Sequence, residues 1–128
     1  MSAVEREVLA PLGETGVRAY IVWTPILDGD DRAAARRAAR QLGGRAHYWD
    51  AGARLGRALG AVLGVPEEEG GVAWDVYLLY DRGRRWRGRP PAPSFWMHQL
   101  PGVKNAPRLD PAGLRERLRE LLMPPARP

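Results

Sequence analysis

The chain has 128 residues, of which 45% are hydrophobic and 27% charged, a size and composition typical of one globular domain with a single core. It contains no cysteine, which excludes thiol–disulfide chemistry, iron–sulfur clusters and cysteine-based zinc sites. The only histidines are His47 and His98, so we expect no metal and no cofactor. No apolar run is long enough to span a membrane, and the first residues lack the basic start of a signal peptide, so we expect a cytoplasmic location.

The charge is distributed unevenly along the chain. Residues 1–81 hold nine Arg against twelve acidic residues, whereas residues 82–128 hold ten Arg and one Lys against three acidic residues. This Arg bias fits a GC-rich genome or heat adaptation as well as it fits phosphate recognition. The pI of about 10.4 is therefore weak support for a nucleic-acid partner.

The N-terminal half is predicted to alternate helices and strands. The helices cover residues 2–12, 31–42 and 50–64, and the strands cover residues 17–23 and 45–49. The first strand is an almost unbroken apolar run, which favours burial on both faces, and it must end before Pro25. Asp50 and the acids around residues 28–31 fit helix caps better than metal ligands. Three glycines at four-residue spacing favour close packing on the sheet or on another subunit, namely Gly52, Gly56 and Gly60.

The C-terminal half begins with the strongest strand signal, VAWDVYLLY over residues 72–80, which again favours burial on both faces. After a turn, residues 84–87 are predicted to return antiparallel as a charged edge strand. A proline-rich linker leads to residues 94–100, SFWMHQL, whose secondary structure the pattern leaves open. Asp110 and Pro111 then open a helix that runs to residue 122 with leucines on one face.

This order of elements, β-α-β-α-β-β-α over about residues 17–122 after an additional N-terminal helix, resembles the thioredoxin-like superfamily. Thioredoxins end their first strand in Trp-Cys-x-x-Cys, and residues 23–27 read WTPIL here. The stretch 75–83, DVYLLYDRG, is similar to the thioredoxin strand that begins at a cis-proline, with Asp75 close to the place of that proline. Thr24 stands where the attacking cysteine would be, so the redox site is absent.

The chain also looks like a group of uncharacterised bacterial proteins that share a WTP turn and an AWDVYLLY…FWMHQL signature. Both resemblances imply a single α/β thioredoxin-like domain over residues 1–128. They imply a central mixed four-stranded sheet with helices on both faces, and they supply no activity.

The resemblance places five residues at one edge of the sheet, and they form the candidate ligand site: Trp23, Thr24, Pro25, Trp74 and Asp75. The Thr24 hydroxyl could donate a hydrogen bond there, and Asp75 could anchor a ligand or act as a general base. An aspartate inside an apolar strand costs several kcal/mol if it is buried without a partner, so we expect Asp75 to be buried and hydrogen-bonded. Structural, ligand-binding and catalytic roles stay open for it.

Two further patches are candidates for partner binding. The first is a possible patch for phosphate or an acidic partner, in which arginines surround one aromatic ring: Arg82, Arg84, Arg85, Trp86 and Arg87. The same alternation also protects an edge strand from pairing. The second is a possible interface that could equally fold back into the core: Phe95, Trp96, Met97 and His98.

The sequence as a whole favours a basic, non-catalytic binding module that forms a homo-oligomer or binds a protein or small ligand. A non-thiol enzyme that uses Thr24 and Asp75 is the first alternative, although we assign no catalytic residue. A nucleic-acid binder that uses the arginine-rich hairpin is the second alternative and the least expected of the three.

Overall fold

The structure is a computed structural model that describes residues 2–12, 16–26, 29–42 and 45–124. The strands are β1 (Tyr20–Trp23), β2 (Ala46–Trp49), β3 (Val76–Leu79) and β4 (Phe95–His98). The longer helices are α3 (Arg32–Leu42), α4 (Arg54–Leu63) and α5 (Pro111–Leu122). The shorter helical pieces are α1 (Ser2–Val4), a π-helical turn (Glu5–Leu9), α2 (Ala10–Leu12) and two 3-10 turns (Ala51–Ala53 and Glu67–Glu69).

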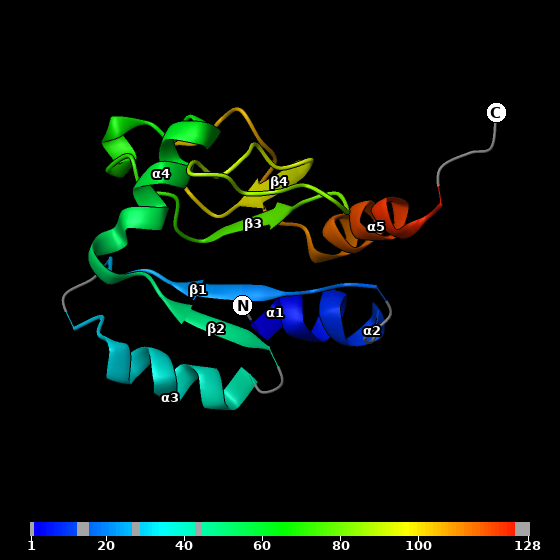
Figure 1. The fold of residues 1–128 in the computed structure, drawn as a ribbon, viewed down its shortest axis with the longest axis horizontal. Coiled ribbons are helices and arrows are strands. Elements are labelled where there is room, and N and C mark those ends of the chain that lie inside the picture. The colour runs from blue at the N-terminus through cyan, green and yellow to red at the C-terminus, as the bar shows by residue number, and fades with distance from the viewer. Residues whose placement is uncertain (1, 13–15, 27–28, 43–44, 125–128) are drawn as a thin grey trace.

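The chain is mixed α/β (Figure 1), and its first three strands lie within the predicted ranges, but the fourth strand is β4 rather than the predicted edge strand at residues 84–87. Leu27 of the WTPIL turn, Asp28 and the glycines predicted to end α3 lie outside the described residues. No helix of the described part is long and apolar enough to cross a membrane.

The strands form two sheets of two strands each. β1 and β2 pair in parallel, with Tyr20 opposite Ala46, while β3 and β4 pair antiparallel, with Leu79 opposite Phe95. Within the described ranges no strand ladder joins β1 to β3, so the predicted four-stranded sheet is not present as one sheet. The two sheets meet through side-chain packing instead, because Ala19 before β1 shares a hydrophobic cluster with Leu79.

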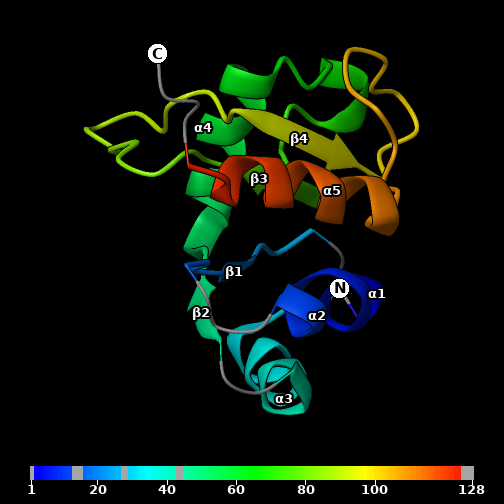
Figure 2. The same ribbon diagram turned by 90° about the vertical axis from the view of Figure 1, so that its right-hand side faces the viewer.

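The β3/β4 hairpin is covered on both faces, as its apolar sequence predicts. The side chains that pack into the cluster beneath α4 are Val76, Leu78 and Trp96. The alternate side chains, which pack with the N-terminal helical segment (residues 2–12) and α5, are Tyr77, Leu79, Phe95 and Met97. Figure 2 shows α4 and α5 on opposite sides of this hairpin. The alternation of side chains along a strand therefore divides the core into two clusters.

The β1/β2 sheet is covered on one face only, so the prediction of burial on both faces is wrong for this strand. Ile21 is buried, but three apolar side chains of the opposite face are exposed, with relative exposures of 60% for Tyr20, 38% for Val22 and 53% for Tyr48. We call the surface of Tyr20, Val22 and Tyr48 the open face.

The open face lies on the side of the sheets that α4 occupies. Thr24 continues the alternation of Tyr20 and Val22, and its Cγ2 lies 3.2 Å from the position that a Cβ on Gly56 of α4 would take. The helix α4 thus reaches the end of β1 and leaves the beginning of the strand uncovered. This incomplete cover is the physical reason for the wrong prediction.

The glycines of α4 allow the helix to approach the chain before β3. A Cβ on Gly60 would overlap the carbonyl group of Gly71, and a Cβ on Gly56 would lie 2.8 Å from Cγ1 of Val72. The Ala73 amide donates to the Gly56 carbonyl at 2.8 Å across this contact. Close packing within the chain, rather than on another subunit, therefore explains both glycines.

The N-terminal helical segment belongs to the core rather than lying outside it. Val4 and Val8 are buried in the cluster that also holds Leu114 of α5. The Glu5 carboxylate forms an ion pair with Arg45 at 3.2 Å. This segment covers the second face of the hairpin together with α5.

Candidate functional site

The predicted edge site is assembled only in part. Thr24 and Pro25 are half-buried after β1, and Trp74 packs on the cluster beneath α4. The indole of Trp23 faces the opposite side of the sheet, toward α3. No hydrogen bond links Thr24 to Asp75 among the residues that the structure describes. The edge therefore brings Thr24 and Trp74 to α4 without building a shared polar centre.

Asp75 is exposed, so the expectation that it is buried is wrong. Its backbone has a φ of +52°, a left-handed conformation that Asp tolerates better than most residues. The carboxylate accepts a hydrogen bond from the Tyr77 hydroxyl at 3.0 Å. The Asp75 carbonyl accepts from the Gln99 amide at 3.1 Å. The left-handed turn before β3 thus removes the carboxylate from the core that its apolar neighbours enter.

The hydroxyl of Tyr77 is the group that Asp75 perturbs. Burial raises the pKa of Tyr77 to about 12, and the negative charge of Asp75 and its hydrogen bond act in the same direction. The side-chain amide of Gln99, which donates to the same hydroxyl at 3.4 Å, opposes the shift of this pKa. A phenol held neutral in this way stabilises the hairpin and is not available as a base near neutral pH.

A cavity of about 220 Å³ lies between α3 and the β1/β2 sheet, and the sequence reasoning missed it. Its lining includes Trp23, His47 and Trp49 from the strands and Arg32 and Arg36 from α3. The Trp23 indole N–H donates to Nδ1 of His47 at 3.1 Å, so Nε2 carries the proton in the neutral ring. That Nε2 atom is buried without a partner in the described part of the chain. Because side chains alternate between the two faces of a strand, the sequence Ala-His-Tyr-Trp of β2 could have placed His47 on the face opposite Tyr48.

The arginine-rich stretch forms an exposed loop rather than the predicted edge strand. We call residues 81–89 the arginine loop; all nine are exposed, and its only β-type contact is one bridge between Arg87 and Arg89. Trp86 is 48% exposed, and its ring centre lies 5.6 Å from that of Tyr80. The ion pairs of the described residues all lie elsewhere: Arg45–Glu5, Arg117–Glu120 and Arg119–Glu116. Among the described residues, the guanidinium groups of the loop therefore have no acidic partner in an ion pair.

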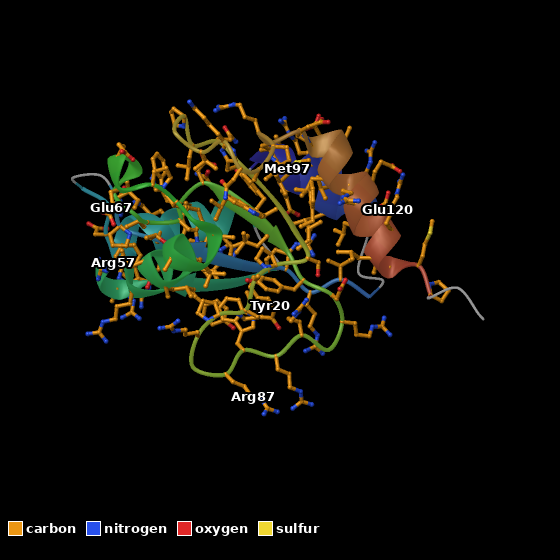
Figure 3. The ribbon with its side chains drawn as sticks, turned by 90° about the horizontal axis from the view of Figure 1, so that it is seen from above. Tyr20, Arg57, Glu67, Arg87, Met97 and Glu120 are labelled. Carbon is orange, nitrogen blue, oxygen red and sulfur yellow. The ribbon has the colours of Figure 1, made fainter. Side chains whose placement is uncertain are left out.

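The arginine loop and the open face lie on the same side of the molecule. In Figure 2 the loop, drawn in yellow-green, projects on the side away from α1, α2 and α3. Tyr20 of the open face and Arg87 of the loop lie on this side in Figure 3. The rings of Tyr20 and Tyr48 form a pair across the strands, with their centres 6.2 Å apart. The fold therefore presents exposed aromatic rings and a cluster of arginines on the same side of the molecule.

The possible interface over residues 95–98 lies in the core. Met97 is 6% exposed and His98 is fully buried in β4. Nδ1 of His98 accepts from the Leu100 amide at 3.0 Å, and Nε2 lies 2.9 Å from the Ala106 carbonyl, which it satisfies as a donor. Phe95 and Trp96 are half-buried in the two hydrophobic clusters. Met97 and His98 are therefore core residues, while Phe95 and Trp96 pack on the core and keep part of their side chains exposed.

No group of three or more acidic or histidine side chains in the described ranges is arranged to hold a metal ion. Asp31 and Asp50 instead accept hydrogen bonds from backbone amides, as their predicted role as helix caps requires. Comparison with known proteins gave no matching family model, no matching curated protein and no matching solved structure. The function must therefore be argued from the geometry of this chain.

Proposed function

We propose that this chain is a thioredoxin-like domain without redox cysteines that works as a non-catalytic binding module for a polyanionic partner. The fold part of the proposal is supported by the spatial order β2, β1, β3, β4 in Figure 1. The arrows of β1 and β3 point in opposite directions in the same view, and Ala19, just before β1, packs against the same cluster as Leu79, at the end of β3. The helix α4 lies on one side, and α3 and α5 lie on the other (Figure 2).

A single observation supports the binding role most strongly: the open face lies on the same side of the molecule as the arginine loop, whose arginines form no ion pair with an acidic residue of the described ranges (Figures 2 and 3). Monomeric proteins rarely leave a cluster of large apolar side chains exposed unless a partner covers it. Arginines that no carboxylate neutralises attract anionic groups, which they bind with a geometry suited to phosphate, sulfate or carboxylate. The two features together give this side of the molecule an exposed apolar area and a basic area.

A second copy of the chain fits this surface less well than an anionic partner. A two-fold dimer through the open face would contact the same patch on both subunits and bring two arginine loops near each other. Like charges at an interface cost binding energy unless acidic groups separate them. The loop offers only Asp81 against five arginines. Charge complementarity therefore favours a partner with many negative charges.

Catalysis at the Thr24 and Asp75 edge has less support than binding. The Asp75 carboxylate is exposed and engaged by the Tyr77 hydroxyl, and Thr24 rests against α4. A general base must lie within hydrogen-bonding reach of the group it activates. A ligand-binding contribution from the edge remains compatible with the proposal.

Retention on heparin tests the binding surface. We expect the double substitution Arg84→Ala with Arg87→Ala to lower the salt concentration at which the protein elutes. The matched control, Arg37→Ala with Arg40→Ala, removes two exposed arginines from α3 and so changes the net charge equally. The proposal requires a clearly larger effect from the loop pair. Equal elution of the two double variants would mean that net charge alone explains retention, and it would overturn the proposed surface.

A further inference from the structure

Three exposed aromatic rings accompany the arginine loop. Tyr20, Tyr48 and Trp86 are 60%, 53% and 48% exposed, and the flat faces of such rings are apolar. Tyr20 and Tyr48 stand on neighbouring strands, and Trp86 stands on the loop itself among five arginines. The surface thus offers stacking positions that a simple anion-binding patch does not need.

The chemistry of these residues narrows the class of polyanion. An acidic polypeptide could form ion pairs with the arginines, but its carboxylate side chains have no flat ring that could stack on the aromatic residues. A single-stranded nucleic acid presents phosphates and unpaired bases together, and bases stack on aromatic side chains whatever their sequence. In a duplex the faces of the bases are already stacked on one another. A duplex would therefore contact the arginines through its phosphates and would not stack on the aromatic rings.

We infer that the polyanion is a single-stranded nucleic acid, whose bases stack on Tyr20, Tyr48 and Trp86 while its phosphates contact Arg84 and Arg87. This inference rests on the proposed function, because it assigns a ligand class to the same surface. The pair of tyrosines, with ring centres 6.2 Å apart, accepts successive bases on one sheet face. The arginine loop lies on the same side of the molecule (Figure 3), so its guanidinium groups are placed to contact the phosphates of the same nucleic acid.

Fluorescence anisotropy with a labelled oligothymidylate of about 12 nucleotides measures this binding directly. Stacking on one aromatic residue is worth ~1–3 kcal/mol, so the double substitution Tyr20→Ser with Tyr48→Ser is expected to weaken binding about tenfold or more. The matched control, Tyr20→Phe with Tyr48→Phe, keeps both rings and should bind within about twofold of the unsubstituted protein. Trp86→Ala, in an exposed loop, tests stacking without touching the sheet.

The salt dependence of the same binding tests the phosphate contacts. Each phosphate contact with a single strand contributes about 0.7 to the slope of log affinity against log salt, so Arg84→Ala with Arg87→Ala should reduce that slope by about 1.4. The Arg37→Ala and Arg40→Ala control should leave the slope unchanged.

The outcomes separate the inference from the function on which it rests. If the arginine pair changes heparin retention but the serine, phenylalanine and Trp86 variants all bind the oligonucleotide equally, the polyanion surface stands and the stacking inference fails. Binding of poly-glutamate as tight as that of oligothymidylate would also overturn it and indicate an acidic protein partner. If neither ligand depends on the loop, the proposed function itself fails. Far-ultraviolet circular dichroism of each variant establishes that lost binding is not lost folding.

Discussion

The two sheets of this protein are built from similar apolar sequences but have different surroundings. The β3/β4 hairpin lies between α4 on one side and α5 with the N-terminal helical segment on the other, and it buries both faces. The β1/β2 sheet is covered on one face and presents Tyr20, Val22 and Tyr48 on the other. An apolar strand therefore predicts that a face can be buried, whereas the helices nearby decide whether it is.

The difference assigns separate roles to the two sheets. The hairpin provides stability, because its side chains are buried or half-buried in the two clusters and both ring nitrogens of His98 are hydrogen-bonded. The β1/β2 sheet provides surface, because burying its open face requires a partner. Substitutions in the hairpin should then cost folding free energy, while substitutions on the open face should change binding and leave stability almost intact.

We expect the largest loss of stability from a substitution in α4, the helix that covers one face of the hairpin. Gly60→Ala places a Cβ where the Gly71 carbonyl group lies, so α4 must move away from the chain before β3. Overpacking against backbone costs ~3 kcal/mol or more, which exceeds the gain of about 1 kcal/mol in helix propensity. Urea denaturation should show the loss. An unchanged midpoint would mean that α4 does not approach the hairpin as closely as the glycine implies.

A smaller loss is expected inside the hairpin at His98. The substitution His98→Leu leaves the Leu100 amide and the Ala106 carbonyl without their partners in the core. Unsatisfied buried groups cost ~1–3 kcal/mol each, partly offset by the apolar leucine, so we expect the free energy of unfolding to fall by about 2 kcal/mol. A variant as stable as the parent chain in urea would argue that His98 is not structurally required.

Alkaline pH should weaken the hairpin through Tyr77. Because the pKa of Tyr77 rises to about 12 in the folded state from 10.0 when unperturbed, the unfolded state loses this proton first. The stabilising contribution is therefore complete below pH 10 and is lost as the pH rises toward 12. In Tyr77→Phe, the free energy of unfolding should fall less steeply across this window.

The Asp75→Asn substitution sharpens the same prediction. It removes the negative charge that raises the Tyr77 pKa but leaves the larger effect of burial in place. Ultraviolet titration of the tyrosinate should show Tyr77 ionising at lower pH than in the parent chain, though still above an exposed tyrosine. An unshifted titration would place Asp75 too far from the hydroxyl to act.

The smallest expected effect is on the open face. Val22 is 38% exposed, so Val22→Thr replaces an apolar methyl with a hydroxyl that water can reach. Exposed substitutions of this kind change stability by less than about 0.5 kcal/mol. The thermal midpoint should stay within experimental error of the parent value. A loss comparable to that of His98→Leu would show that the face is buried and would remove the contrast between the sheets.

Local signals in the sequence predicted the elements well because they act over a few residues. Asp31 and Asp50 accept backbone hydrogen bonds at the helix starts, and Gly64 ends α4 in a left-handed conformation. The stretch 95–98 gave no such signal, since it becomes a strand only by pairing with β3, which lies far away in the sequence.

The site was harder to predict than the elements because it depends on which faces are covered. The apolar neighbours of Asp75 suggested burial, but a positive φ at that residue turns its carboxylate to solvent. The open face could not be foreseen, because it depends on how far α4 extends over β1. The five arginines of the loop were visible in the sequence, whereas their position on the same side of the molecule as Tyr20 was not.

Amide chemical shifts measured by nuclear magnetic resonance during titration with oligothymidylate test the central claim most directly. We expect the largest shifts on β1 around Tyr20 and Val22 and on the arginine loop, with little change in α3 and α5. Shifts concentrated instead on α3 around Arg32 and Arg36, which line the cavity, would contradict the proposed surface, because they would place the binding site on the covered side of the sheet.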